Sequence, residues 1–216
     1  MVSKKILLLR HGETDWNIEL RFQGSRDIPL NARGEEQAKR VSQRVRPWAP
    51  EVVVSSPLQR ALKTAALVSG RSEKRITVDP LLSEISFGIW EGCSTRELNS
   101  QGELFSIWKQ EPFSVPVPEA ESENDIIERA RAVVQKLTLL PQERVLVVSH
   151  GGTLRALLAV ALQIPFRSAW KYFRLSNCSL TGLEYSAERF VLAFYNDHIC
   201  GCETDDGGRP YAPVTF

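Results

Sequence analysis

Short unbroken runs of apolar residues alternate along the chain with segments in which apolar residues recur every three or four positions. Unbroken runs are typical of strands buried on both faces of a sheet, and the wider spacing is typical of amphipathic helices. The runs predict strands over residues 4–9, 51–55, 76–78 and 145–149, and a closing pair of strands over residues 180–185 and 190–195.

Helices are predicted between these strands from their apolar faces and their stop signals. One opens at residues 31–34 and is stopped by Pro47 and Pro50, because proline interrupts helical hydrogen bonding. Its apolar face is formed by Ala38, Val41, Val45 and Trp48. Ser56 and Pro57 are interpreted as the N-cap and first position of the next helix, which Gly70 ends. Amphipathic patterns over residues 126–137 and 154–162 predict two more helices.

Strands and helices that alternate in this way predict an α/β fold, namely a three-layer α/β/α sandwich with a mostly parallel central sheet. The length of 216 residues suits one domain, which we expect over residues 1–202. Residues 81–121 contain several prolines and are expected to form an irregular lid or substrate-binding region. Residues 203–216 are expected to be a loosely ordered tail.

The charge balance argues against polyanionic partners. Lys+Arg 27 and Asp+Glu 26 leave a net charge of +1, so neither nucleic acid nor a membrane is expected as a partner. No apolar stretch approaches the roughly 20 residues of a membrane-spanning helix, and the N-terminal run is too short for a signal peptide. Cys200-Gly201-Cys202 has the wrong spacing for zinc or a redox pair, so the four cysteines are expected to be reduced thiols in a cytoplasmic protein.

Two of the three histidines stand at the ends of predicted strands and directly before a glycine. They are His11, after Arg10, and His150, after Ser149. An open α/β sheet places its ligand site beyond the carboxyl ends of its strands, so the two histidines are expected to share a pocket although they lie 139 positions apart. Arg10 and Arg60 add guanidinium groups at the end of a strand and near the start of a helix, where anions bind. This combination indicates a phosphate site.

Features that the sequence lacks narrow the type of phosphate chemistry. It has no Gly-x-x-x-x-Gly-Lys segment of a nucleotide-binding loop, and its acidic residues do not cluster as metal ligands would. We therefore expect no metal and no cofactor, with positively charged side chains stabilising the transferred group.

Four segments resemble, in family order, the motifs of the histidine phosphatase superfamily in its phosphoglycerate mutase-like branch. They are Arg10-His11-Gly12-Glu13-Thr14 with Asn17 and Gln23-Gly24, residues 55–61, residues 82–92, and Ser149-His150-Gly151-Gly152. The resemblance covers most of the chain and implies a phosphoglycerate mutase-like fold. It also implies a small phosphatase that is independent of cofactors.

The resemblance assigns roles to individual residues. His11 would be the nucleophile that forms a phosphohistidine, and Glu84 would be the general acid and then the general base. Arg10, Arg60 and His150 would bind the transferred phosphoryl group, while Asn17, Gln23, Gly24 and Gly151 would add substrate contacts. Glu13 and Glu91 are rival acids, which only the motif separates from Glu84.

Three functions are open within such a family. The first is metal-independent hydrolysis of a small phosphorylated metabolite through a phosphohistidine. The second is phosphoryl transfer of the phosphoglycerate mutase type, for which family members use a longer segment between the acid and the second histidine. Here Glu84 and His150 lie only 66 positions apart, which favours hydrolysis. The third is a non-catalytic phospho-ligand binding module, which would be expected to lack the nucleophile or the acid.

The least readable part of the chain is the region that would select the substrate. The expected partner is a small phosphorylated metabolite, and the resemblance allows a homodimer. An apolar lid over the leaving group, or alternatively a satellite core, is predicted for Phe22, Trp90, Phe105, Trp108 and Phe113. Arg21 and Arg26 could meet a substrate carboxylate or stay solvated, and His198 is expected to be structural.

Overall fold

The computed structural model describes residues 3–100 and 102–198 and is built around one six-stranded sheet. The strand order is β3-β2-β4-β1-β5-β6, in which β3, β2, β4 and β1 are parallel and β5 and β6 are antiparallel. The strands are β1 (Lys4–Arg10), β2 (Val52–Ser55), β3 (Thr77–Val78), β4 (Arg144–Ser149), β5 (Leu180–Ser186) and β6 (Arg189–Asp197). This arrangement confirms the predicted α/β fold with a mostly parallel central sheet.

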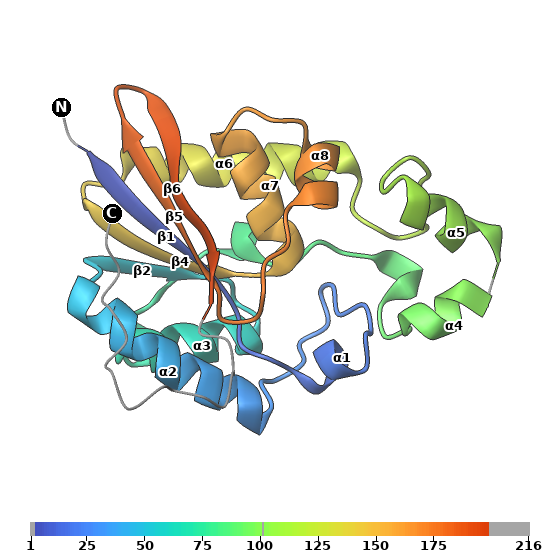
Figure 1. The fold of residues 1–216 in the computed structure, drawn as a ribbon, viewed down its shortest axis with the longest axis horizontal. Helices are drawn as coiled ribbons and strands as arrows, with labels where there is room; N and C mark the ends of the chain where they lie inside the picture. The colour runs from blue at the N-terminus through green and yellow to red at the C-terminus, as the bar shows by residue number, and fades with distance from the viewer. Residues whose placement is uncertain (1–2, 101, 199–216) are drawn as a thin grey trace.

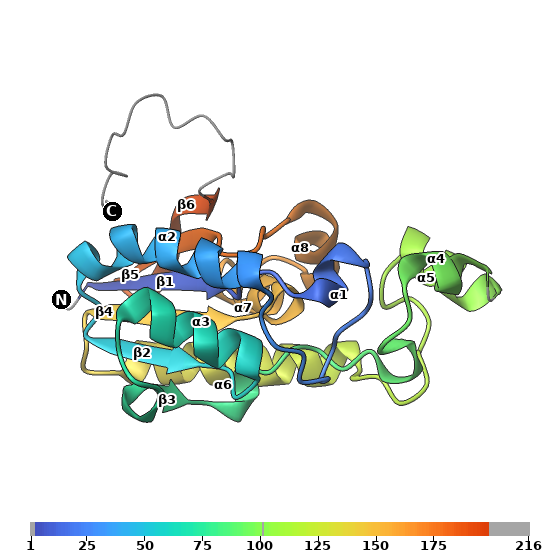
Figure 2. The same ribbon diagram turned by 90° about the horizontal axis from the view of Figure 1, so that it is seen from below.

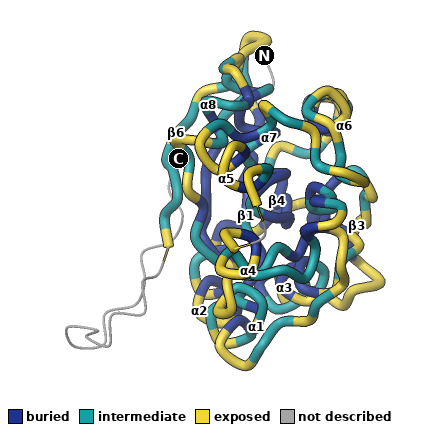
Figure 3. The backbone as a smooth tube through the Cα atoms, turned by 90° about the vertical axis from the view of Figure 1, so that its right-hand side faces the viewer, coloured by how far each residue is buried: buried dark blue, intermediate teal, exposed yellow. Residues whose placement is uncertain are grey.

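Helices cover both faces of the sheet (Figures 1 and 2). One face carries α2 (Ala32–Trp48) and α3 (Gln59–Ser69), and the other carries α6 (Glu123–Leu139), α7 (Gly151–Ala161) and α8 (Phe166–Tyr172). Three short helices lie beyond the carboxyl end of β1: α1 (Asp15–Ile18), α4 (Thr95–Ser100) and α5 (Glu103–Gln110). Figure 3 looks onto this end, where β1 and β4 are buried behind them. Three 3-10 turns complete the described elements, at Glu73–Arg75, Pro80–Leu82 and Gly88–Trp90.

Alternate side chains of the central strands feed two separate cores. Ile6 and Leu8 of β1 pack into the core under α6 and α7, whereas Leu7 and Leu9 pack into the core under α2 and α3. A strand buried on both faces explains why its sequence is an unbroken apolar run. None of the helices within the described residues combines the length and the hydropathy needed to cross a membrane.

The segment 81–121 is more regular than its prolines suggested, and this expectation is corrected. It contains α4 and α5, because Leu98, Phe105 and Trp108 turn inward to a common aromatic cluster. Trp90, Phe105 and Trp108 are buried, and Phe22 contacts all three rings at centroid distances of 5.9–6.0 Å. Of the two interpretations of these aromatics, core packing holds for Trp90, Phe105 and Trp108, whereas Phe22 joins their cluster and also lines the cavity described below.

Helix boundaries differ from the predictions for local reasons. Helix α3 begins at Gln59 rather than at Pro57: the Gln59 N–H donates to Asp27 Oδ1 at 2.7 Å, and Ser56 Oγ accepts from the Leu58 N–H just before the helix, at 3.2 Å. Helix α2 continues through Pro47 to Trp48. Helix α8 has no counterpart in the predictions. The tail over residues 203–216 and the Cys200-Gly201-Cys202 segment lie outside the described residues.

Candidate active site

A cavity of about 410 Å³ lies at the carboxyl end of β1, between the loops that follow the strands. Eight of the nine predicted site residues line it, namely Arg10, His11, Asn17, Gln23, Gly24, Arg60, Glu84 and Gly151. The ninth, His150, is fully buried behind His11, with the two imidazole centroids 5.1 Å apart. The fold therefore gathers residues from four distant segments of the sequence around one space.

The His11 ring is held in one tautomer. Its Nδ1 lies 2.7 Å from the carbonyl oxygen of Gly12, which can only accept, so Nδ1 carries the proton and Nε2 keeps a free lone pair. Burial is the main cause that lowers the pKa of His11 well below its ordinary value of 6.5, with Arg60 and Arg10 adding repulsion. A neutral imidazole with a free nitrogen can act as a nucleophile at neutral pH.

Two buried guanidinium groups give the cavity its positive charge. Arg10 Nη1 donates to the carbonyl of Leu175 at 2.6 Å, while its Nε is buried without a partner. Burial lowers the pKa of Arg10 to about 10, which leaves it charged at neutral pH. Arg60 is fully buried and donates from Nη1 to Arg26 O at 2.6 Å and from Nη2 to Gly24 O at 2.8 Å. Arg60 thus fixes the loop that covers one side of the cavity.

His150 connects this cation to the second predicted motif. Its Nδ1 accepts from Arg60 Nε at 3.1 Å, so its Nε2 carries the proton and donates to Ser56 Oγ at 2.7 Å. Burial and then the charge of Arg60 lower the pKa of His150 well below 6.5. Both ring nitrogens have protein partners in this arrangement. Ser56 Oγ, which was expected to cap a helix, accepts from the Leu58 N–H at 3.2 Å and also from His150.

The Glu84 carboxylate is docked on the N-terminus of α7. Oε2 accepts from the Gly152 N–H at 3.1 Å, and Oε1 accepts from the N–H groups of Thr153 and Ile85, both at 3.0 Å. Free N–H groups at a helix start favour an anionic partner, which explains why the acid is held here. No space is left for a side chain at position 152, where a Cβ would lie 2.8 Å from Glu84 Oε1.

The two alternative acids, Glu91 and Glu13, make hydrogen bonds and ion pairs outside the cavity. Glu91 accepts from the N–H groups of Ser25 and Phe87 at 2.9 and 3.1 Å and lies 3.6 Å from the Arg26 guanidinium. Glu13 accepts from the Asn31 side chain at 3.2 Å and lies 3.7 Å from Arg33. Neither lines the cavity, so Glu84 is the carboxylate that reaches it.

Arg155, Trp170 and Asn177 are among the cavity residues that sequence reasoning missed. The Asn177 side-chain nitrogen donates to His11 O, Gly12 O and Asn17 Oδ1 at 3.1, 3.2 and 3.1 Å. It therefore braces the nucleophile loop and orients Asn17. Arg155 stands four positions after Gly151 in α7, a spacing that puts both on one helix face and could have revealed it.

A family model described as "Histidine phosphatase superfamily (branch 1)" matches residues 6–198. The chain belongs to this superfamily. The match spans all four motifs that the sequence of this histidine phosphatase contains. Its membership rests on the sequence match as well as on the fold, and it is a phosphatase-type enzyme.

Relatives of this histidine phosphatase carry both phosphatase and mutase names. A protein from Salmonella arizonae named "Probable phosphoglycerate mutase GpmB" is 34% identical over 194 residues, which is 87% of each chain. The α-ribazole phosphatase structure from Shigella flexneri aligns with a TM-score of 0.80 at 29% identity, covering 89% of this chain and 96% of that one. The phosphoserine phosphatase structure from Entamoeba histolytica aligns with a TM-score of 0.77 at 28% identity, over 89% and 96%.

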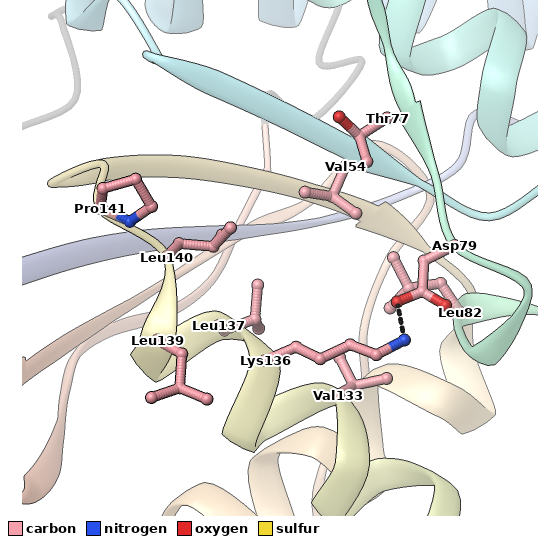
Figure 4. A pocket seen from close by; sticks show the side chains of 10 residues that line it. All are labelled: Val54, Thr77, Asp79, Leu82, Val133, Lys136, Leu137, Leu139, Leu140 and Pro141. Atoms are coloured by element: carbon pink, nitrogen blue, oxygen red, sulfur yellow. Dashed lines mark hydrogen bonds and ion pairs between the residues drawn. The ribbon is translucent and has the colours of Figure 1, made fainter.

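A second cavity, of about 340 Å³, has a different character (Figure 4). It lies between the β2 and β3 edge of the sheet and the C-terminal turn of α6, and its lining is mostly aliphatic. Its charged side chains, Asp79 and Lys136, pair with each other at 2.9 Å. Within residues 3–100 and 102–198 no group of His, Cys, Asp and Glu side chains could hold a metal ion, in either cavity or elsewhere.

Proposed function

We propose that this histidine phosphatase hydrolyses the phosphomonoester of a small metabolite through a phosphohistidine at His11. The observation that carries the proposal is the tautomer of His11. Its Nδ1 proton is held by Gly12 O, which leaves Nε2 free in a cavity lined by Arg10, Arg60 and Glu84. These groups supply a nucleophile, charge stabilisation and a proton source.

In the first step, His11 Nε2 attacks phosphorus and the ester P–O bond breaks. The Glu84 carboxylic acid gives its proton to the departing alkoxide oxygen. In the second step, the Glu84 carboxylate takes a proton from water, and the water oxygen attacks phosphorus. The P–N bond then breaks and inorganic phosphate leaves with His11 neutral again. Splitting the transfer in two in this way is ordinary nucleophilic catalysis.

The remaining site residues act on the phosphoryl oxygens. Arg10 Nε, buried without a partner, is available for one of them. Asn17, Gln23 and the backbone at Gly24 and Gly151 supply further contacts from the cavity wall. His150 holds Arg60 by the bond to its Nε and so stabilises charge without carrying the phosphoryl group.

His11→Ala tests the proposal directly. Phosphate release should fall by several powers of ten while the circular dichroism spectrum stays unchanged, because removing a covalent nucleophile typically costs that much. Rapid acid-free quenching of the unmodified enzyme with labelled substrate should trap a label on His11. A His11→Ala enzyme that retained a tenth of the rate would contradict a phosphohistidine.

We further propose that the reaction needs no metal, because the charge around phosphorus is supplied by guanidinium groups. Activity should survive EDTA, and loss in EDTA with rescue by Mg²⁺ would contradict this. We propose a cytoplasmic location, where the described thiols of Cys93 and Cys178 stay reduced, to be checked by fractionation.

Residues 1–202 are proposed to act as one domain, and the protein is proposed to form a homodimer. The exposed edge strand β3 beside the aliphatic cavity of Figure 4 supports an association surface. Light scattering on the native enzyme and on Val78→Pro would test the homodimer, since proline blocks pairing at a sheet edge.

A second candidate is phosphoglycerate mutase activity, which the names of the sequence relatives favour. The spacing of 66 positions between Glu84 and His150 favours hydrolysis instead. Incubation with 3-phosphoglycerate separates the two. Hydrolysis gives stoichiometric inorganic phosphate, whereas isomerisation without phosphate release would establish the mutase.

A further inference from the structure

The segment that carries Glu84 is held by side chains rather than by a regular element. Residues 83–86 belong to no helix or strand, so no ladder of backbone hydrogen bonds fixes them. The proposed acid must nevertheless stay in place through two steps, first to give a proton to the leaving oxygen and then to take one from water. A misplacement of about 1 Å in such a group can slow a reaction by about a hundredfold. The contacts that fix the backbone around position 84 therefore bear on catalysis.

Arg129 of α6 holds the backbone on the N-terminal side of Glu84. Its Nη1 donates to Leu81 O at 2.7 Å and to Ser83 O at 2.9 Å. Ser83 O also accepts from Thr153 Oγ1 at 2.6 Å, and the Thr153 N–H donates to Glu84 Oε1 at 3.0 Å. The carbonyl directly before Glu84 is therefore bound both by α6 and by α7, the helix whose start binds the carboxylate.

Glu121 holds the backbone on the C-terminal side of Glu84. It stands just before α6, and its N–H donates to Ser86 O at 3.0 Å. Its Oε2 accepts from the Ser86 N–H at 3.4 Å. The same carboxylate accepts from Arg129 Nε and Nη2, both at 2.8 Å. The ion pair thus connects the two sets of contacts that bracket the acid.

The pair can fix the segment without placing a net charge beside the acid. Both side chains are largely buried, at 15% and 18% exposure, and the bidentate geometry matches each charge with the other. The planar guanidinium of Arg129 donates four hydrogen bonds at once, two to the carboxylate and two to backbone carbonyls. A single ammonium group could not reproduce this fork.

We propose that the Arg129–Glu121 ion pair positions the general acid through the backbone at Ser83 and Ser86. Neither residue of the pair lines the active-site cavity, so both are positioning residues that meet no substrate. This inference rests on the proposed function of Glu84 and adds the residues that keep the acid aligned with the leaving oxygen. Loss of the pair should slow only the steps in which Glu84 gives or takes a proton.

Arg129→Lys tests the geometry of the pair, because lysine keeps the charge and loses the fork. Turnover of glycerol 2-phosphate, whose alkoxide needs a proton, should fall by about ten- to a hundredfold. With p-nitrophenyl phosphate, whose leaving group needs no proton, the burst of one p-nitrophenolate per active site should keep its native rate.

A variant with both charges removed keeps the test decisive if a change at Arg129 alone disturbs folding. Arg129→Met together with Glu121→Met leaves no buried charge without its partner, which is the main cost of breaking such a pair. This double variant should be at least as slow as Arg129→Lys on glycerol 2-phosphate and should also keep the native burst. Urea unfolding of both variants shows that the fold is retained.

Arg167→Met is the matched control. Arg167 binds Glu123 Oε2 through Nη2 and Nε at 2.8 and 2.9 Å, and its Nη2 donates to Phe113 O at 3.0 Å. This arginine–glutamate pair also joins α6 to an irregular segment, but that segment does not carry Glu84. The variant should turn over both esters at native rates. If Arg167→Met slowed glycerol 2-phosphate as Arg129→Lys does, the effect would belong to the packing of α6, and the inference would be overturned.

A cycle with Glu84→Gln separates this inference from the proposed function. If Arg129 acts through the acid, adding Arg129→Lys to Glu84→Gln should slow glycerol 2-phosphate no further. Additive losses, a burst that is slowed equally, or native turnover by the double methionine variant would each overturn the inference and leave Glu84 as the acid. Native turnover by Glu84→Gln would instead reject the acid of the proposed function, and the inference with it.

Discussion

At the scale of single residues, Glu84 and His11 divide the labour of acid and nucleophile through their hydrogen bonds. His11 is neutral because burial lowers its pKa, and its proton lies on Nδ1, which donates to Gly12 O. Glu84 accepts from three backbone N–H groups, those of Gly152 and Thr153 at the start of α7 and that of Ile85. His11 therefore needs to lose no proton before it attacks. Glu84 is placed to exchange a proton with the leaving group.

Glu84→Gln should slow hydrolysis of an alkyl phosphate by about 10²- to 10⁴-fold, the usual contribution of general acid–base catalysis. With p-nitrophenyl phosphate, whose leaving group needs no proton, the first step should survive. A stopped-flow trace should then show a burst of one p-nitrophenolate per active site followed by slow turnover. Glu13→Gln is the control and should retain nearly native rates. Equal slowing of both substrates without a burst would remove Glu84 from the role of acid.

Asn177 should act as a positioning residue through Asn17 and the His11 loop. Asn177→Ala removes three donated hydrogen bonds, and kcat/KM should fall by about ten- to a hundredfold on the usual energy of such bonds. Asn177→Asp has the same shape but presents an acceptor to three acceptors, so it should be worse than alanine. If Asn177→Asp had native activity, the Asn177 side chain would only fill space and would not position the His11 loop.

Kinetics of a double variant can show whether Asn177 works through Asn17. The effects of Asn17→Ala and Asn177→Ala on kcat/KM should be less than additive in the double variant. Asn17→Ala removes the Asn17 amide, and Asn177→Ala removes the hydrogen bond that orients the same amide. Additive losses would mean that the contact at 3.1 Å does not orient Asn17.

At the scale of elements, the site depends on a close approach between the loop after β1 and the start of α2. A Cβ at Gly34 would lie 2.1 Å from Glu13 O, and a Cβ at Gly12 would lie 2.5 Å from Gly34 O. These are backbone atoms, which cannot move aside as a flexible side chain would. The glycine pair thus lets α2 support the segment whose carbonyl holds the His11 proton.

Gly34→Ala should therefore lower the free energy of unfolding by about 1–3 kcal/mol, the usual cost of forcing extra atoms into a packed contact. It should also reduce phosphate release, since the Gly12 carbonyl would shift with the loop. Urea unfolding measures the first effect and a steady-state assay the second. Lys39→Ala, at an exposed position of the same helix, should change neither. If Gly34→Ala had the native free energy of unfolding, the loop after β1 would be able to move away from α2 without cost.

Elements with a long, continuous pattern were predictable, and those shaped by tertiary packing were not. The apolar run of β1 and the spacing of apolar residues on α6 predicted both elements, because the burial of a strand or of a helix face produces a local pattern in the sequence. Helices α4 and α5 form where Phe105 and Trp108 reach an aromatic cluster supplied partly by Phe22, a contact that local periodicity does not encode.

The candidate site shows the same limit. Histidines before glycines at strand ends, with an arginine near a helix start, gave a signal that led to His11, His150 and Arg60, whereas Glu84 was identified only by the family motif. Asn177 carries no such signal, because its importance comes from what the folded chain brings near it, whereas the helical spacing of Arg155 from Gly151 was a signal that went unused. Ser56 accepts from the Leu58 N–H close to where a cap was predicted, but its contact with His150, which follows a distant strand, could not be predicted locally.

At the scale of the whole molecule, two buried neutral histidines make stability depend on pH. The pKa values of His11 and His150 are lowered in the folded state, so below pH 6.5 the unfolded chain binds protons that the folded chain refuses. Their contribution to stability is therefore fully present above the unfolded pKa of about 6.5 and declines as the pH falls below it.

Each histidine should contribute up to about 1.4 kcal/mol per pH unit to this decline. Urea unfolding of the native protein at pH 7.5, 6.5 and 5.5 measures the slope. His11→Asn should reduce it, because asparagine does not titrate, and His198→Asn is the control, since that histidine is exposed. An unchanged slope in His11→Asn would mean that the buried ring accepts its proton without cost.

The place of β1 in the sheet has a consequence for the order in which the chain can complete its fold during synthesis. β1 leaves the ribosome first, yet its two neighbours are β4 at residues 144–149 and β5 at residues 180–186. Strand β1, whose residues Ile6 to Leu9 are fully buried in the completed fold, must therefore wait for its partners until most of the chain has been made. During that interval its unpaired edges are open to other nascent chains, and folding factors that shield apolar segments would act here first. The nucleophile that follows β1 gains its surroundings only with the last strands, so recovery of catalysis reports the final event of folding.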